Sequence, residues 1–158
     1  MTDAVKLNGE LARRLPSGLF VLRIVLGLFM LQWTIEKFVL PQTTAHIMEK
    51  YFGVELSGFL PQILGGLELI VVITFLLGAY RRLSYGLILL FNLASIGATW
   101  HKLIDPYGLL SGTVNHLFTA GVPLLAASWL LYWLRDWDVM WSFDEKRSAS
   151  AGTAGQRG

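Results

Sequence analysis

The sequence predicts an all-α fold: a polytopic membrane protein whose four transmembrane helices form one bundle, with both termini in the cytoplasm. Hydrophobic residues make up 54% of the 158 residues and charged residues only 15%. About a quarter of the residues are charged in an average soluble domain. Four apolar stretches of about twenty residues or slightly more can each cross a hydrocarbon core of about 30 Å. These stretches are Ser17–Leu40, Ser57–Tyr80, Leu83–Leu103 and Val114–Leu134.

The placement of basic residues sets the expected orientation. Nine of the 13 lysines and arginines lie in the N-terminal segment, between the second and third stretches, or after the fourth stretch. Lys37, Lys50 and Lys102 lie toward the other side, and Arg23 is expected to snorkel inward from the second turn of the first helix. Because cytoplasmic loops carry the excess of Lys and Arg, we expect both termini in the cytoplasm.

The chain divides into three parts. Residues 1–16 are predicted as a cytoplasmic N-terminal segment, residues 17–144 as the membrane domain, and residues 145–158 as a disordered cytoplasmic tail of low complexity. The first apolar stretch is too long for the core of a signal peptide and lacks a cleavage pattern after it. It is therefore expected to remain as a helix.

The two outer connections differ in length. The loop Pro41–Leu56 is long enough for a short surface helix over Thr43–Phe52, which fits an interfacial lid better than a partner-binding helix. The second loop, Asp105–Gly112, has the composition of a turn. Arg81 and Arg82 lie in a tight hairpin on the opposite, cytoplasmic side.

Four ionisable residues within the apolar stretches form the candidate site. Charge at the centre of a membrane helix costs at least about 2.5–3.5 kcal/mol, and such residues are usually functional. At about 1.5 Å per residue, Glu36 and His101 lie at the outer ends of the first and third helices, and His116 lies in the first turn of the fourth. Glu68 lies about 16 Å into the second helix, near the midplane. It must be protonated, paired with another helix or exposed to a wet cavity.

Each candidate also has a structural interpretation. Glu36 can snorkel to the interface, and His101 can be an interfacial residue satisfied by water. The functional hypothesis is that Glu36, His101 and His116 converge on one outer pocket. Glu68 cannot reach either interface, so we expect it to face the bundle and to bond a polar group of another helix. The candidate partners are Arg23, Gln32 and Asn92.

The residue types limit the chemistry of this site. The chain has no cysteine, which excludes thiolate metal sites, iron–sulfur clusters and disulfide exchange. No His-x-x-His, His-x-x-x-His or Glu-x-x-His pair occurs within one helix, so no metal is predicted. A quinone headgroup needs only a His or Glu hydrogen bond, a proton path and aromatic walls; the sequence permits a quinone cofactor without requiring one. The net charge of +2 is too small to indicate a nucleic-acid partner.

Three short motifs lie near the ends of the predicted helices. Arg23 and Gly27 precede Glu36-Lys37-Phe38; Gly65-Gly66-Leu67-Glu68 precedes Gly78-Ala79-Tyr80-Arg81; and Ser142-Phe143-Asp144 follows the fourth helix. In these motifs the chain resembles the DoxX family of small four-helix bacterial membrane proteins, over roughly residues 15–144. The resemblance implies the bacterial cytoplasmic (inner) membrane and a membrane-integral component of oxidoreductase systems, because the family is named after a subunit of a thiosulfate:quinone oxidoreductase. It implies a fold more firmly than a function.

The leading hypothesis is an integral membrane subunit or accessory factor of a respiratory or redox complex that contacts quinone near its outer polar layer. The alternatives are an oligomeric permease for a small molecule or ion, lined by Glu68 and the stripe Asn92–Thr99, and a purely structural assembly factor. No enzymatic activity of the chain alone is predicted, and any activity would belong to a membrane oxidoreductase of which it is a subunit. The expected partners are the lipid bilayer and either other subunits or further copies of this chain.

Overall fold

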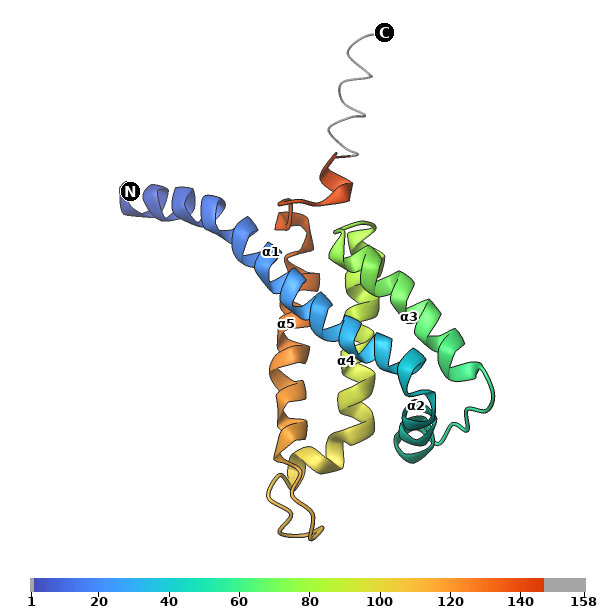
Figure 1. Ribbon diagram of the computed structural model, residues 1–158. Coiled ribbons are helices and arrows are strands. Elements are labelled where there is room, and N and C mark those ends of the chain that lie inside the picture. Colours follow the sequence, from blue (N-terminus) through green and yellow to red (C-terminus); the bar gives the residue numbers. More distant parts are fainter. Residues whose placement is uncertain (1, 147–158) are drawn as a thin grey trace.

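The computed structural model describes the backbone of residues 2–146 and the side chains of residues 9–146, and the described part is helical without strands. Five α-helices are joined by shorter turns (Figure 1). Their bounds are α1 Thr2–Val39, α2 Pro41–Ile47, α3 Leu60–Leu76, α4 Arg81–Ile104 and α5 Gly121–Trp133. A π-helical turn, Met48–Phe52, follows α2, and 3-10 turns at His116–Ala120 and Arg135–Trp137 flank α5.

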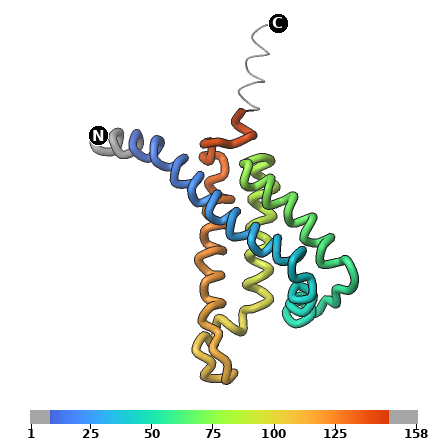
Figure 2. The backbone as a smooth tube through the Cα atoms, viewed as in Figure 1, coloured from blue at the N-terminus to red at the C-terminus, as the bar shows by residue number. Residues whose placement is uncertain are grey.

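The long helices pack in two pairs. α1 packs chiefly against α3, and α4 chiefly against α5, while α3 and α4 are joined by a tight turn. Figure 2 shows α4 and α5 running side by side, with α1 crossing them obliquely. Buried side chains from α1, α3, α4 and α5 meet in one core, whose members are Leu19, Leu26, Met30, Val72, Phe75, Tyr85, Ile88 and Leu131.

The molecule has two distinct ends. One holds the α3–α4 turn and residues 134–146 and is called the hairpin end below (Figure 1, top). The other holds α2, the π-helical turn and residues 105–120 and is called the loop end (Figure 1, bottom). α1 and α3 both run from one end to the other.

Three helices are long and apolar enough to cross a membrane: Gly9–Val39, Arg81–Ile104 and His116–Trp133. Many large apolar side chains on these helices are exposed, among them Val25, Leu93 and Trp129. Exposed apolar faces of this extent fit contact with lipid rather than with water. The composition and the helices together mark the chain as a helical membrane protein.

The second apolar stretch was predicted over Ser57–Tyr80, but its helix, α3, has only 17 residues. Gly58 has a φ of 60° and Pro61 lies in the first turn, so the backbone enters the helix late. Gly78 has a φ of 60°, which ends the helix before the turn to α4. The predicted surface helix is present as α2 and its π-helical turn, beginning at Pro41 rather than Thr43.

At the C-terminus, residues 143–146 form a helical turn. Most of the tail predicted to be disordered, residues 147–158, lies outside the described residues. The predicted N-terminal segment, by contrast, is the continuous beginning of α1 from Thr2 onward.

Candidate functional site

The most deeply buried polar cluster lies at the hairpin end and centres on Arg23. Its side chain is fully inaccessible, as is that of Asp138. Arg23 Nη1 lies 3.1 Å from Asp138 Oδ2 and donates a hydrogen bond to Tyr85 Oη at 3.3 Å, and Tyr85 Oη donates to Asp138 Oδ2 at 2.6 Å. Arg23 Nη2 donates to the carbonyl oxygens of Met140 and Trp141 at 2.9 and 3.3 Å. The guanidinium of Arg23 is thus paired inside the protein, with groups that follow the last candidate span.

The same end is tied together by the chain that returns after α5. Ser142 Oγ donates to the carbonyl oxygen of Gly78 at 2.8 Å. The carboxylate of Asp144 accepts hydrogen bonds from the backbone N–H groups of Tyr80 and Arg81, each at 3.0 Å. A carboxylate on the first free N–H groups of α4 caps that helix and complements its dipole.

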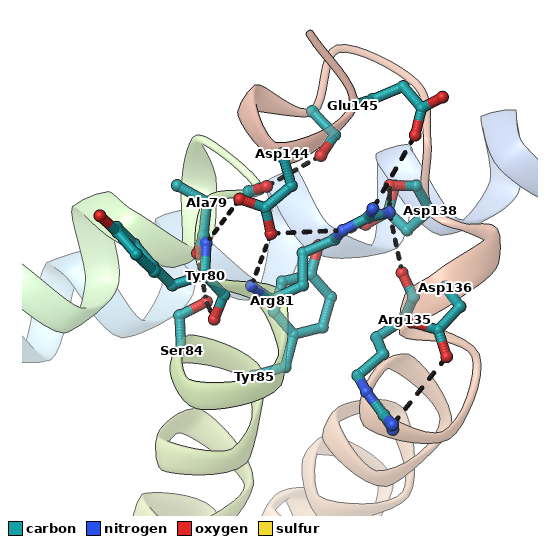
Figure 3. Close-up of polar contacts among 12 residues, drawn as sticks. Ala79, Tyr80, Arg81, Ser84, Tyr85, Arg135, Asp136, Asp138, Asp144 and Glu145 are labelled. Carbon is teal, nitrogen blue, oxygen red and sulfur yellow. Dashed lines mark hydrogen bonds and ion pairs between the residues drawn. The ribbon is translucent and has the colours of Figure 1, made fainter. Parts of the chain in front are cut away.

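Arg81 completes this network, as Figure 3 shows. Its Nη1 donates to the carbonyl oxygens of Asp138 at 2.8 Å and Arg135 at 3.1 Å. Its guanidinium also lies 3.6 Å from the carboxylate of Asp144 and 3.9 Å from that of Glu145. Burial raises the pKa of the Asp138 carboxyl, against the hydrogen bond from Tyr85 and the positive charges of Arg23 and Arg81.

Parts of all three motifs on which the family resemblance rests meet at this end: Arg23 of the first, Gly78–Arg81 of the second, and Ser142-Phe143-Asp144. Arg23, Gly78, Arg81, Ser142 and Asp144 are all part of one hydrogen-bonded network or in contact with it. A Cβ at Gly78 would collide with Arg23 Nη1, so glycine is required there for the arginine to fit. These residues therefore join α1, the α3–α4 turn and the chain that follows α5.

Glu68 lies on the face of α3 that packs against α1. Its Oε2 is 2.8 Å from Lys37 Nζ, and its Oε1 accepts a hydrogen bond from Thr34 Oγ1 at 3.0 Å. The side chains of Lys37 and Glu68 are only 19% and 15% exposed, so this pair is largely shielded from solvent. Gly65 on α3 lets α1 approach, since a Cβ there would lie 3.0 Å from Lys37 Cβ.

Glu68 thus bonds another helix, but the three predicted partners were wrong. Arg23 is already paired with Asp138, and Gln32 lies on an exposed face of α1. Asn92 is buried and donates to the carbonyl oxygen of Ile88 in its own helix. Lys37 takes the role instead, because its long stem bridges the distance from the end of α1.

The other three predicted site residues are not brought together. Glu36 is half-buried, and its side chain makes no hydrogen bond or ion pair with any described residue. His101 and His116 are both exposed. Within residues 9–146, no hydrogen bond, ion pair or ring contact joins any two of Glu36, His101 and His116.

His101 has aromatic neighbours instead. Its ring stacks on Tyr51 of the π-helical turn, with centroids 6.4 Å apart and planes at 23°, and meets the edge of Trp100 at 6.3 Å. Tyr51 also contacts Phe118 at 6.2 Å. These rings join three separate segments at the loop end, a contact that sequence spacing did not indicate.

The loop before His116 is held by Asp105. Its carboxylate accepts hydrogen bonds from the N–H groups of Leu109, Leu110 and Ser111 at 2.7–3.0 Å. Desolvation acts against ionisation of this carboxyl, but the hydrogen bonds outweigh it and hold the pKa of Asp105 below its usual value. Asn115 Nδ2 donates to the carbonyl oxygen of Asp105 at 3.2 Å, which buries Asn115 and leaves the adjacent His116 outside.

Two further observations bear on ligand chemistry at the loop end. An open hollow of about 420 Å³ lies beside α2 and is lined by Gln42, Ala45, His46, Glu49, Glu55, Leu56 and Ser57, none of them a predicted site residue. Over the described part of the chain, no three His, Asp or Glu side chains gather as metal ligands. Comparison of the sequence and structure with protein-family models, curated proteins and solved structures found no match.

Proposed function

We propose that this protein is an integral membrane subunit or accessory factor of a redox complex, built on a DoxX-like bundle of four transmembrane helices with both termini cytoplasmic. The bacterial cytoplasmic membrane is its proposed location. At about 1.5 Å per residue, the 17 residues of α3 extend about 26 Å, close to the thickness of a hydrocarbon core. α3 also runs between the same two ends as α1, which supports its role as the fourth span.

The observation that carries this proposal is the difference in how polar groups are used inside and outside the bundle. Arg23, Asp138, Lys37 and Glu68 pair with one another within the chain, which supports a scaffold. The imidazole of His101 remains exposed on an aromatic surface at the loop end. An exposed imidazole can hydrogen-bond a quinone carbonyl, and neighbouring rings can pack on the quinone ring.

The test is extraction of the protein from its native membrane in polymer-bounded lipid discs. Quinone is then quantified by mass spectrometry and co-purifying subunits are identified. Loss of one hydrogen bond, worth about 1 kcal/mol, predicts about a fivefold lower quinone occupancy in His101→Ala. His46→Ala is the matched control, because His46 is exposed at the same end without a ring contact to Tyr51.

Absence of both quinone and partner subunits in the wild-type discs would contradict the proposal. Quinone retained equally by His101→Ala and His46→Ala would leave the subunit role and remove the assigned contact. Partner subunits without quinone would support the assembly-factor version of the same role.

A second candidate, an oligomeric permease, has one observation in its favour. Ala94 and Gly97 are exposed one turn apart on the same face of α4, and a Cβ at Gly97 would meet no atom within 4 Å. Small residues allow two membrane helices to approach closely. Purification of a bare homo-oligomer that conducts ions or releases solute in vesicles would favour this function over the first.

A further inference from the structure

The first four turns of α1, residues 2–16, extend beyond the bundle and are called the N-terminal arm here. Every residue from Gly9 to Arg14 is exposed, whereas Leu15 and Leu19 already belong to the core or pack against it. Figure 1 shows the start of α1 turning away from the direction of the rest of the helix at the hairpin end. Pro16 lies inside the helix near this change of direction, where its ring removes one backbone hydrogen bond.

The arm is amphipathic by sequence. Leu11 and Leu15 are spaced by four residues and therefore lie on one side of the helix. Arg13 lies on the opposite side, and Glu10 and Arg14 lie along the border between the two sides. Leu11 is 52% exposed, so the apolar side is not covered where it is described.

Basic residues concentrate at the same end of the molecule. Arg13 and Arg14 of the arm are exposed, and Arg82 is exposed at the start of α4. The only contact of Arg14 with an acid in the described residues is a solvent-exposed pair with Glu10 at 3.7 Å, which screening makes weak. This end thus presents positive charge around a helix that leaves the bundle sideways.

We propose that the N-terminal arm lies in the plane of the membrane surface and binds anionic phospholipid headgroups. The side that carries Leu11 enters the boundary between headgroups and acyl chains, and Arg13 and Arg14 contact the phosphates. A helix with a narrow apolar side and arginines on the other is the pattern of an interfacial helix. Among residues 9–14 the exposed apolar side chains are Leu11 and Ala12, and two side chains of this size are too small an area for a stable interface with a partner protein or a second copy.

The absence of native cysteine makes the arm accessible to single-site labelling. Leu11→Cys and Glu10→Cys each carry one environment-sensitive fluorophore in the full-length protein, reconstituted into vesicles of phosphatidylcholine alone or mixed with phosphatidylglycerol. In the mixed vesicles, nitroxide-labelled lipid should quench the probe at position 11, and aqueous iodide should quench the probe at position 10. In phosphatidylcholine alone, lipid quenching at position 11 should fall.

The charge requirement is tested on the same labelled protein. Each basic residue near an anionic surface contributes about fivefold to binding, so Arg13→Gln with Arg14→Gln should lower the ratio of docked to free arm by about 25-fold. Lys50→Gln with Lys102→Gln removes the same charge at the loop end and should leave this ratio unchanged.

Three results would overturn the proposal. Equal iodide quenching at positions 10 and 11 in mixed vesicles would show an undocked arm. Docking that is independent of phosphatidylglycerol would exclude recognition of anionic headgroups. Protection of position 11 from both quenchers, with a disulfide between unlabelled Leu11→Cys protomers, would identify a second copy as the occupant.

Discussion

The two ends of the molecule treat buried charge in opposite ways. At the hairpin end, Arg23 and Asp138 are fully inaccessible and neutralise each other. Away from the hairpin end, His101 and His116 are exposed, and the ion pair Lys37–Glu68 retains partial access to solvent. An ionisable residue in an apolar helix therefore does not by itself indicate a functional site, because its meaning depends on whether the chain supplies its partner.

The largest loss of stability is expected from replacing Arg23 at the hairpin end. Arg23→Met should lower the free energy of unfolding by about 3–5 kcal/mol, because it leaves the Asp138 carboxylate buried without its ion-pair partner. Thermal or denaturant unfolding of the purified protein in detergent measures this loss. The double variant Arg23→Met with Asp138→Leu should recover much of it. If Arg23→Met costs no more than Lys37→Met, the two ends do not differ as described.

The next largest loss of stability is expected from replacing Gly78 in the α3–α4 turn. Gly78→Ala forces a side chain into a left-handed backbone conformation, at about 1–2 kcal/mol, and adds a collision with Arg23. Gly97→Ala is the control, because its Cβ meets open space and alanine favours a helix by about 0.5–1 kcal/mol. The melting temperature should fall for the first variant and rise or stay constant for the second. A fall of equal size in both would mean that the turn is not the cause.

The ion pair between Lys37 and Glu68 should contribute less to the free energy of unfolding. Glu68→Gln keeps the hydrogen bond to Thr34 but loses the charge facing Lys37, and we expect a loss of about 1–2 kcal/mol. A double-mutant cycle with Lys37→Met isolates the coupling between the two side chains. A coupling near zero would show that the pair is formed but does not stabilise. Loss of activity of a host complex at unchanged stability would instead indicate a proton-linked role for Glu68.

The smallest effect concerns pH and the loop that Asp105 holds. Its folded-state pKa lies below the ordinary value of about 3.9, so the carboxylate stabilises the loop at pH values above the unfolded-state pKa. This contribution is lost as the pH falls through the folded-state pKa. Hydrogen exchange at Leu109, Leu110 and Ser111 should accelerate in that acidic range beyond the intrinsic pH trend. Asp105→Asn should exchange faster near neutral pH and lose this pH response; equal protection in both proteins would contradict the assignment.

Apolar length and composition were sufficient to predict an all-helical membrane protein and to locate most of its long helices. They could not predict where α3 begins and ends, because Gly58 and Gly78 impose positive φ values that an apolar stretch does not report. The short surface helix was predictable from the length of the loop Pro41–Leu56, whereas its π-helical continuation was not. Helix existence is encoded by local pattern, whereas helix ends depend on single backbone positions.

The candidate site was less predictable for a related reason. Depth along a helix was estimated from residue counts, but the direction of each side chain was not. Glu36, His101 and His116 share a level at the loop end without facing one another. The ion-pair partner of Arg23 is Asp138, which lies 115 residues away in the segment that follows the fourth apolar stretch. A pairing over such a distance is decided by the packing of α1, α4 and the returning chain together.

The distance in sequence between Arg23 and Asp138 also bears on biogenesis. A membrane protein is synthesised and inserted from its N-terminus, so α1 enters the bilayer long before its counter-charge exists. Ser142 and Asp144 arrive later still, and until then the turn between α3 and α4 lacks its side-chain cap. The segment that locks the first helix in place thus leaves the ribosome after α1, α3, α4 and α5. A chain interrupted before residue 138 lacks the carboxylate that pairs with Arg23 and the cap of the turn, so we expect such a chain to be less stable in the membrane than the full chain.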